Sequence, residues 1–161
     1  MTGAHPASAG ESEVVVTRIF HAPRALVFQF WIQPEHLAKW WGPVGFQLPR
    51  EDLVVEMRPG GRYQLHLVEA ATGAEVWVHG QIVELLEPEV LAIRMDVPQP
   101  IGLPSMKTIV RVQFDDLGEQ TRVTLRQGPF TTAEQREQTT AGWGQSFDKL
   151  DQILIASNHS D

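Results

Sequence analysis

The chain has 161 residues, of which 42% are hydrophobic, so it is long enough to form one compact domain with a buried core. Its 13 Lys and Arg residues are outnumbered by 20 Asp and Glu residues, and the net charge of -7 disfavours nucleic acid and anionic membranes as partners. The absence of cysteine excludes disulfides, thiol catalysis and metal sites built on thiolates.

The first segment, MTGAHPASAGES, is rich in Ala, Gly and Ser and predicts a disordered tail over residues 1–12. It lacks the basic start and the apolar run of a signal peptide. No apolar stretch of the chain approaches the ~18 residues that a membrane span needs. We therefore expect a cytoplasmic protein whose single folded domain covers residues 13–157.

The next segment predicts a strand followed by two short helices. Residues 14–20 are β-branched and apolar, as is typical of a strand. Pro23 and Pro34 each suit the first turn of a helix, where the missing backbone N–H costs nothing. The second helix is expected to close at Trp40-Trp41-Gly42-Pro43.

Alternating apolar and polar residues then predict a series of strands joined by short turns, so that consecutive strands pair antiparallel. The expected strands are residues 53–57, 62–67, 75–86, 91–97, 109–114 and 121–127. In the last pair, Val112, Phe114, Val123 and Leu125 share one face of the sheet, and polar residues occupy the other face. The apolar face must be covered.

A long C-terminal helix is the expected cover. Thr131 or Thr132 can cap its first turn, with Glu134 or Gln135 reaching back. An apolar stripe at helical spacing follows, formed by Trp143, Phe147, Leu150 and Leu154. A helix of ~25 residues ending near Leu154 would be long enough to cross a six- or seven-stranded sheet. These patterns predict an α+β, helix-grip fold, in which a curved antiparallel sheet of six to seven strands wraps around a long helix.

Two groups of motifs carry a resemblance to a known family. The first is the strand, two helices and strand between Arg18 and Gly61, which ends in Met57-Arg58-Pro59-Gly60-Gly61. The second is Gly142-Trp143 on the closing helix. Over roughly residues 13 to 156 the chain resembles the START-like (SRPBCC) helix-grip superfamily. Within it, the chain is similar to the bacterial proteins related to the C-terminal domain of the activator of the ninety-kilodalton heat-shock-protein ATPase. The resemblance implies a helix-grip fold with an apolar cavity between sheet and helix.

Aromatic and methionine side chains are the candidates to line this cavity. They are Trp41, Met57, Tyr63, Trp77, His79, Met95, Trp143 and Phe147. Tyr63 or His79 would orient a bound molecule. The alternative is that these rings only fill the core. His66 is expected on the polar, outward face. The face of the sheet on which His79 lies is undecided. The residues that share its parity are Trp77 and Gln81, but also the apolar Val83 and Leu85.

Two further features suit a binding site. Ile101 and Leu103, in the proline-rich loop 98–104, could form a lid over the cavity mouth, or could pack on an edge of an ordinary connection. Gly142 and Gly144 lie inside a helical pattern, where each costs ~1 kcal/mol relative to Ala. They could allow close approach to the sheet or to a ligand, or mark a break between two helices.

The leading hypothesis is the binding of a small hydrophobic or aromatic molecule. One alternative is an enzyme like the polyketide cyclases and aromatases of the same superfamily. The other is a co-chaperone that stimulates a heat-shock ATPase in the stress response, as the family name implies. No catalytic residue is assigned, and no metal or cofactor motif is found. The expected partner is a small apolar ligand, with no nucleic acid and no membrane, and a homodimer is left open.

Overall fold

The structure, a computed structural model, describes residues 12–98, 100 and 105–159. The expected tail therefore lies outside the described residues except for Ser12, and so do Ile101 and Leu103, the two residues of the expected lid. Among the described residues, no helix is both long and apolar enough to cross a membrane.

The N-terminal elements follow the sequence pattern closely. Strand β1 (Val14–Phe20) leads into helix α1 (Arg24–Ile32), and helix α2 (Pro34–Trp40) follows after Gln33 alone. Pro23 is the N-cap of α1, and Pro34 is the first residue of α2. Each proline therefore sits where a helix has no use for its N–H group.

The remaining strands form one antiparallel sheet with β1. They are β2 (Phe46–Gln47), β3 (Val54–Val55), β4 (Arg62–Glu69), β5 (Glu75–Leu86), β6 (Val90–Val97), β7 (Met106–Asp116) and β8 (Thr121–Gly128). The strand order is β1-β8-β7-β6-β5-β4-β2, and β3 also pairs with β4. The sheet formed by the described residues thus has eight strands, of which β2 and β3 contribute two residues each.

The predicted strand 53–57 is shorter than expected. A 3₁₀ turn, η2 (Arg50–Asp52), precedes it, and the chain reverses directly after Val55. In that reversal Arg58 N donates to Glu56 O, and Gly61 N donates to Arg58 O. A Cβ atom at Gly61 would lie 2.1 Å from Glu56 O, so the reversal requires glycine there. Glu56 and Met57, which alternation alone assigned to the strand, therefore belong to this tight turn.

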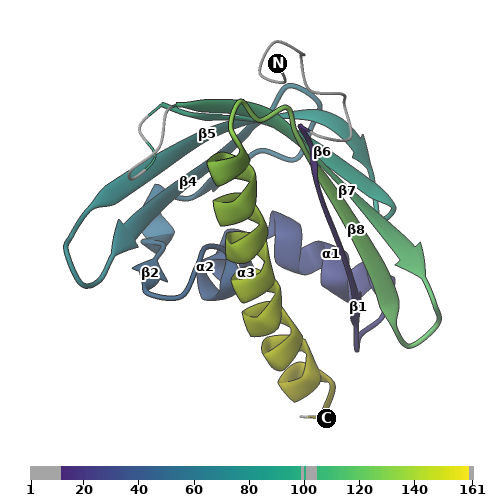
Figure 1. The fold of residues 1–161 in the computed structure, drawn as a ribbon. Helices are drawn as coiled ribbons and strands as arrows, with labels where there is room; N and C mark the ends of the chain where they lie inside the picture. The colour runs from purple at the N-terminus through teal and green to yellow at the C-terminus, as the bar shows by residue number, and fades with distance from the viewer. Residues whose placement is uncertain (1–11, 99, 101–104, 160–161) are drawn as a thin grey trace.

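Helix α3 (Ala133–His159) lies inside the arch of the sheet, and α1 and α2 lie on the same hollow side (Figure 1). Its cap is the predicted one: Gln135 N donates to Thr132 Oγ1 at 3.0 Å, and Gln135 Oε1 accepts from Thr131 N at 3.1 Å. The helix continues through Gly142 and Gly144, so the alternative of a break between two helices is wrong.

An aromatic cluster joins the elements on the hollow side. The ring of Phe147 lies 5.3 Å from that of Phe20 in β1, 6.0 Å from Trp31 in α1 and 6.3 Å from Trp40 in α2. Leu150 and Leu154 extend this buried stripe along α3. The architecture is the predicted α+β, helix-grip fold, with the core between the curved sheet and the helices α1, α2 and α3.

Candidate functional site

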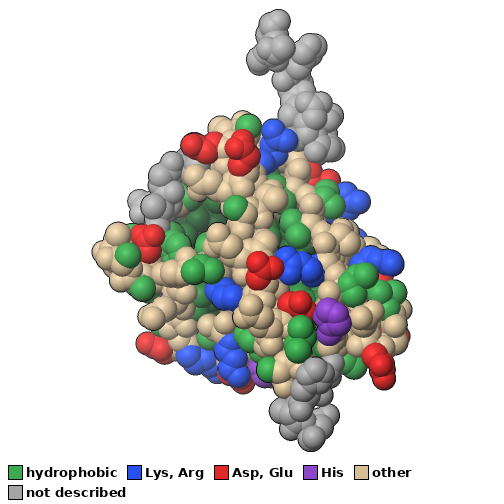
Figure 2. Space-filling model, turned by 60° about the horizontal axis from the view of Figure 1, so that its bottom comes forward, with side chains coloured by type: hydrophobic (Ala, Val, Ile, Leu, Met, Phe, Trp, Pro, Cys, Tyr) green, Lys and Arg blue, Asp and Glu red, His purple; other side chains and the backbone are tan. Residues whose placement is uncertain are grey.

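A cavity of about 550 Å³ lies between the first half of α3, the loop after α2 and the hollow face of strands β4 to β8. Apolar side chains dominate its wall, among them Trp41, Leu67, Val76, Val78, Met95 and Trp143. In Figure 2 a hollow with hydrophobic side chains inside it opens on one face of the molecule. Such a wall favours a ligand that has a large apolar surface.

The pairing of β4 with β5 explains which residues face this cavity. Leu65 lies opposite Val78, and Leu67 lies opposite Val76. Residues directly opposite one another in an antiparallel pair project to the same face. The even-numbered residues at the start of β5 therefore face α3.

A short chain of hydrogen bonds forms the polar part of the wall. Gln127 in β8 is 7% exposed. Its Nε2 donates to Thr108 Oγ1 at 2.9 Å, and its Oε1 accepts from Trp143 Nε1 at 2.7 Å. Ser146 lines the same space one turn along α3 and is 2% exposed. Glu69 is the single ionisable side chain among the described lining residues.

Trp143 is held on several sides. Besides the bond to Gln127, its ring stacks on Trp31 at 5.7 Å with the planes 26° apart. It also meets the ring of Trp41 edge to face at 5.5 Å and 79°. Trp143 thus forms a fixed part of the wall, with its position set by three elements.

Gly142 contributes backbone but no side chain to this wall. It lines the cavity, and a Cβ atom there would lie 3.8 Å from Pro43 Cγ, which is an ordinary contact distance. A Cβ atom at Gly144 would meet nothing within 4 Å. Of the two glycines, Gly142 alone is among the described residues that border the cavity.

Three of the predicted site residues, Trp41, Met95 and Trp143, line the cavity together. Met57 instead packs against the core and is half-buried. Phe147 and Tyr63 are fully buried in the core. The hydroxyl of Tyr63 donates to the backbone carbonyl of Trp31, and burial raises the pKa of the phenol. Tyr63 therefore already uses the group that was expected to orient a ligand.

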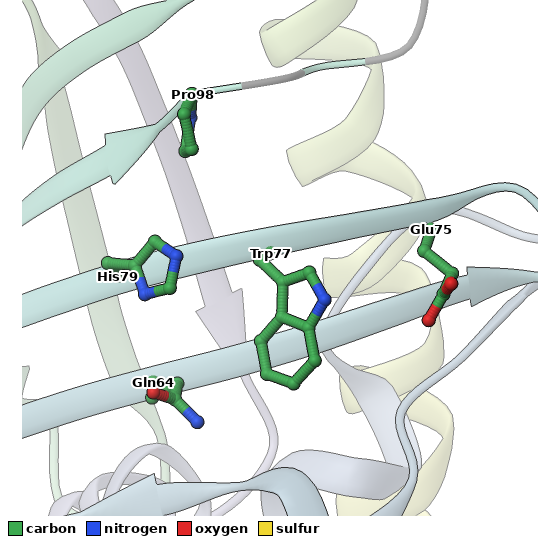
Figure 3. Close-up of a pocket in the computed structure, with 5 residues that line it drawn as sticks. All are labelled: Gln64, Glu75, Trp77, His79 and Pro98. Atoms are coloured by element: carbon green, nitrogen blue, oxygen red, sulfur yellow. The ribbon is translucent and has the colours of Figure 1, made fainter.

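Trp77 and His79 require a correction, because they lie on the opposite, outer face of the sheet. Trp77 is paired with His66 and His79 with Gln64, and neither borders the cavity beside α3. Trp77 and His79 therefore lie on the same outward face that was expected for His66. They border a second pocket of about 510 Å³, together with Gln64, Glu75 and Pro98 (Figure 3).

A bulge explains why the side of His79 was undecided. The β5–β6 register shifts between Ile82 and Glu84. The inserted residue reverses the alternation, so Leu85 packs against the core although it shares parity with His79. If the alternation is followed across the bulge without a break, residues from the two faces of the sheet are assigned to the same face.

Gln127 is the main residue that sequence reasoning missed. It continues the alternation of Val123 and Leu125, both of which are fully buried. A polar residue on the apolar face of a strand was the available signal, because a buried amide needs hydrogen-bond partners and so marks a polar point in the core.

The described residues contain no group of three or more His, Asp or Glu side chains placed to hold a metal ion. The polar groups that the cavity wall offers include the amide of Gln127, the hydroxyl of Ser146 and the carboxylate of Glu69.

Comparison with known proteins gives a family and a fold. The model of a protein family described as activator of Hsp90 ATPase homolog 1-like protein matches residues 21–155. None of the curated proteins compared with the chain matches it.

Several solved structures are similar over most of the chain. Protein CV1439 from Chromobacterium violaceum is 25% identical, with a TM-score of 0.79 over 89% of this chain and 96% of that one. The AHSA1 protein from Silicibacter pomeroyi is 19% identical, with a TM-score of 0.78 over 90% and 99%. CalU16 from Micromonospora echinospora is 19% identical, with a TM-score of 0.64 over 92% and 80%. The last two likenesses concern the fold alone.

Proposed function

Because the chain belongs to the family of activator of Hsp90 ATPase homolog 1-like proteins, which has a START-like fold, we propose that it binds a small hydrophobic or aromatic molecule in the cavity beside α3. The observation that carries the proposal is the cavity itself, about 550 Å³ between the sheet and the helix. This volume lies within the range of about 300–1,000 Å³ that is usual for small-molecule sites.

Apolar burial supplies the affinity in this proposal. Val76, Val78 and Met95 line one side, and Trp41 and Trp143 line the other. Removing apolar surface from water contributes roughly 25 cal/mol per Å². Met95 adapts its shape easily, so it would adjust to ligands of different outline.

A few polar groups would orient the molecule. Gln127 and Ser146 lie in the wall. The indole N–H of Trp41, which also lines the cavity, is buried and has no hydrogen-bond partner among the described residues. A buried donor without an acceptor costs free energy, so a water or an acceptor atom of the bound molecule would stabilise this site.

Binding without reaction is the simpler form of the proposal. A cyclase-like reaction needs an acid or a base that contacts the substrate. Glu69 is the one ionisable side chain among the described residues of the wall, and it lies at the end of β4. An enzyme of this kind would have to depend on that carboxylate, so Glu69→Gln would abolish turnover while leaving ligand binding in place.

The test is a titration of tryptophan fluorescence with a panel of fatty acids, flavonoids and polycyclic aromatics. We expect saturable quenching by at least one panel member in the native protein. The quenching should be reduced in Trp143→Phe, which removes one of the two tryptophans that line the cavity and its bond to Gln127. Trp77→Phe is the matched control, since Trp77 lies on the outer face and should leave the saturation curve unchanged.

The variant Met95→Ala gives a second test of the proposal. It enlarges the cavity, so it should shift preference toward bulkier panel members. The proposal is wrong if no panel member gives saturable quenching and native mass spectrometry of the purified protein shows no co-purified small molecule. A surface partner, such as a heat-shock ATPase, would then be the next candidate to test by co-sedimentation.

A further inference from the structure

The outer face of the sheet carries a flat aromatic surface, which we call the outer platform and define as the rings of Trp77 and His79 on β5. Their planes are 8° apart and their centroids 6.3 Å apart. Figure 3 shows the two rings side by side with their faces turned out of the sheet, and with Gln64, Glu75 and Pro98 around them. They border the pocket of about 510 Å³ described above.

His66 supports the platform from beneath. Its ring stacks on Trp77 at 3.9 Å with the planes 7° apart, and it is 6% exposed, so Trp77 covers it. His66 Nδ1 lies 2.9 Å from Asp52 Oδ2, and Nε2 lies 2.7 Å from Glu75 Oε1. Hydrogen bonds on both nitrogens fix the plane of the imidazole, and the stacked indole is held with it. The platform is therefore rigid before any ligand arrives.

The charge around the platform is negative. Two carboxylates, those of Asp52 and Glu75, lie against the single imidazole of His66, and one imidazole cannot offset two negative charges. The side chain of Glu75 is 58% exposed, so it remains accessible at the rim.

The cations on this face lie beside other groups. Arg62 Nη2 is 3.3 Å from Glu56 Oε2. Lys107 lies opposite Asp96, which in turn lies opposite His79. Arg94 donates to Gln81 at 3.0 Å. A free ligand with a positive charge would therefore meet an acidic rim.

We propose that the outer platform is a second binding site, independent of the cavity beside α3, and that it takes a planar aromatic cation. The ligand's ring stacks on the free faces of Trp77 and His79, where the indole also attracts positive charge. A cationic or N–H group at the ring's edge lies against Glu75, and the amide of Gln64 hydrogen-bonds the opposite edge.

The test uses proflavine, a planar cationic dye, and follows its fluorescence anisotropy as the protein is added. We expect saturable binding to one site. Trp77→Leu should weaken it about tenfold, because the indole face is lost. Glu75→Gln should weaken it several-fold while its Oε1 can still accept from His66, and it should not weaken binding of anthracene-2-sulfonate, an anionic ring of similar size.

Two controls separate this site from the cavity and from folding. Trp143→Phe changes the cavity wall and should leave proflavine binding unchanged. If Trp77→Leu fails to fold by circular dichroism, the exposed His79→Ala replaces it and should weaken binding several-fold. The proposal is overturned if the folded variants bind proflavine as the native protein does. It is also overturned if Trp143→Phe removes the binding, because the dye then occupies the cavity.

Discussion

Trp143 and Trp77 have different roles, because they lie on opposite sides of the sheet. Trp143 is 6% exposed and forms part of the cavity wall, with its N–H bonded to Gln127. Trp77 lies flat on the outer face over His66. The same side chain therefore serves as a wall in one place and as a stacking surface in the other.

His36 gives a residue-scale prediction about pH. Burial lowers its pKa, nearby Lys39 lowers it further, and Glu35 acts in the opposite direction. Its Nδ1 atom is buried and has no hydrogen-bond partner in the described part of the chain, and its ring stacks on Phe30 at 4.2 Å. As the pH falls through the ordinary value of 6.5, the unfolded chain takes up this proton before the folded protein does. His36 therefore lowers the free energy of unfolding below that pH and contributes nothing well above it.

The measurement is the urea midpoint at about pH 7.5 and about pH 5.5. The native protein should lose more stability between these two values than His36→Gln does, because the two proteins differ only at this imidazole. Equal losses of stability in the two proteins would contradict a lowered pKa of His36 in the folded state.

At the scale of elements, α3 is held by its cap and by its contact with β1. Thr132 caps the first turn, and Arg18 of β1 forms an ion pair with Asp148 at 2.9 Å. The half of the helix near Gly142 borders the cavity, and the half near Leu154 packs in the core. The helix thus combines a binding segment with a stabilising segment.

The two glycines of α3 test this division. Gly142→Ala and Gly144→Ala should each raise the free energy of unfolding by about 0.5–1 kcal/mol, because alanine loses less backbone entropy in a helix. Only Gly142→Ala should also change ligand affinity in the fluorescence titration, since its methyl group would enter the cavity wall beside Pro43. Equal effects of both variants on binding would show that the cavity is not the binding site.

For the whole molecule, the aromatic cluster around Phe147 joins parts that are far apart in the sequence. Its ring contacts β1, α1 and α2 from a position on α3. The first and last elements of the fold therefore depend on the same buried side chains. We infer that the sheet and its helices unfold together rather than separately.

Phe147→Ala measures this coupling. It should lower the free energy of unfolding by about 3–5 kcal/mol, because a large buried ring leaves a cavity that several elements share. Far-ultraviolet circular dichroism and tryptophan fluorescence should give the same transition in the native protein and in the variant. Two separate transitions would mean that α3 detaches on its own.

Local patterns in the sequence were enough to determine most of the elements and their inner faces. The alternation in β8, the stripe of Trp143 and Leu150 on α3, and the cap at Thr132 are each properties of a few neighbouring residues. Backbone geometry sets the strand period at two and the helix period at 3.6, so these patterns can be read without knowing the fold. The cavity candidates were chosen by residue type rather than by period, and Trp41, Met95 and Trp143 are the ones among them that border the cavity.

Only the tertiary structure decided the rest of the site. The pairing of β5 with β4 places Trp77 and His79 on the outer face, and the bulge between Ile82 and Glu84, which exists only in the pairing of β5 with β6, separates their alternation from that of Leu85. Tyr63 was indistinguishable from a cavity residue until its partner, the Trp31 carbonyl, was known. Both depend on contacts between residues distant in sequence, which local periodicity does not contain.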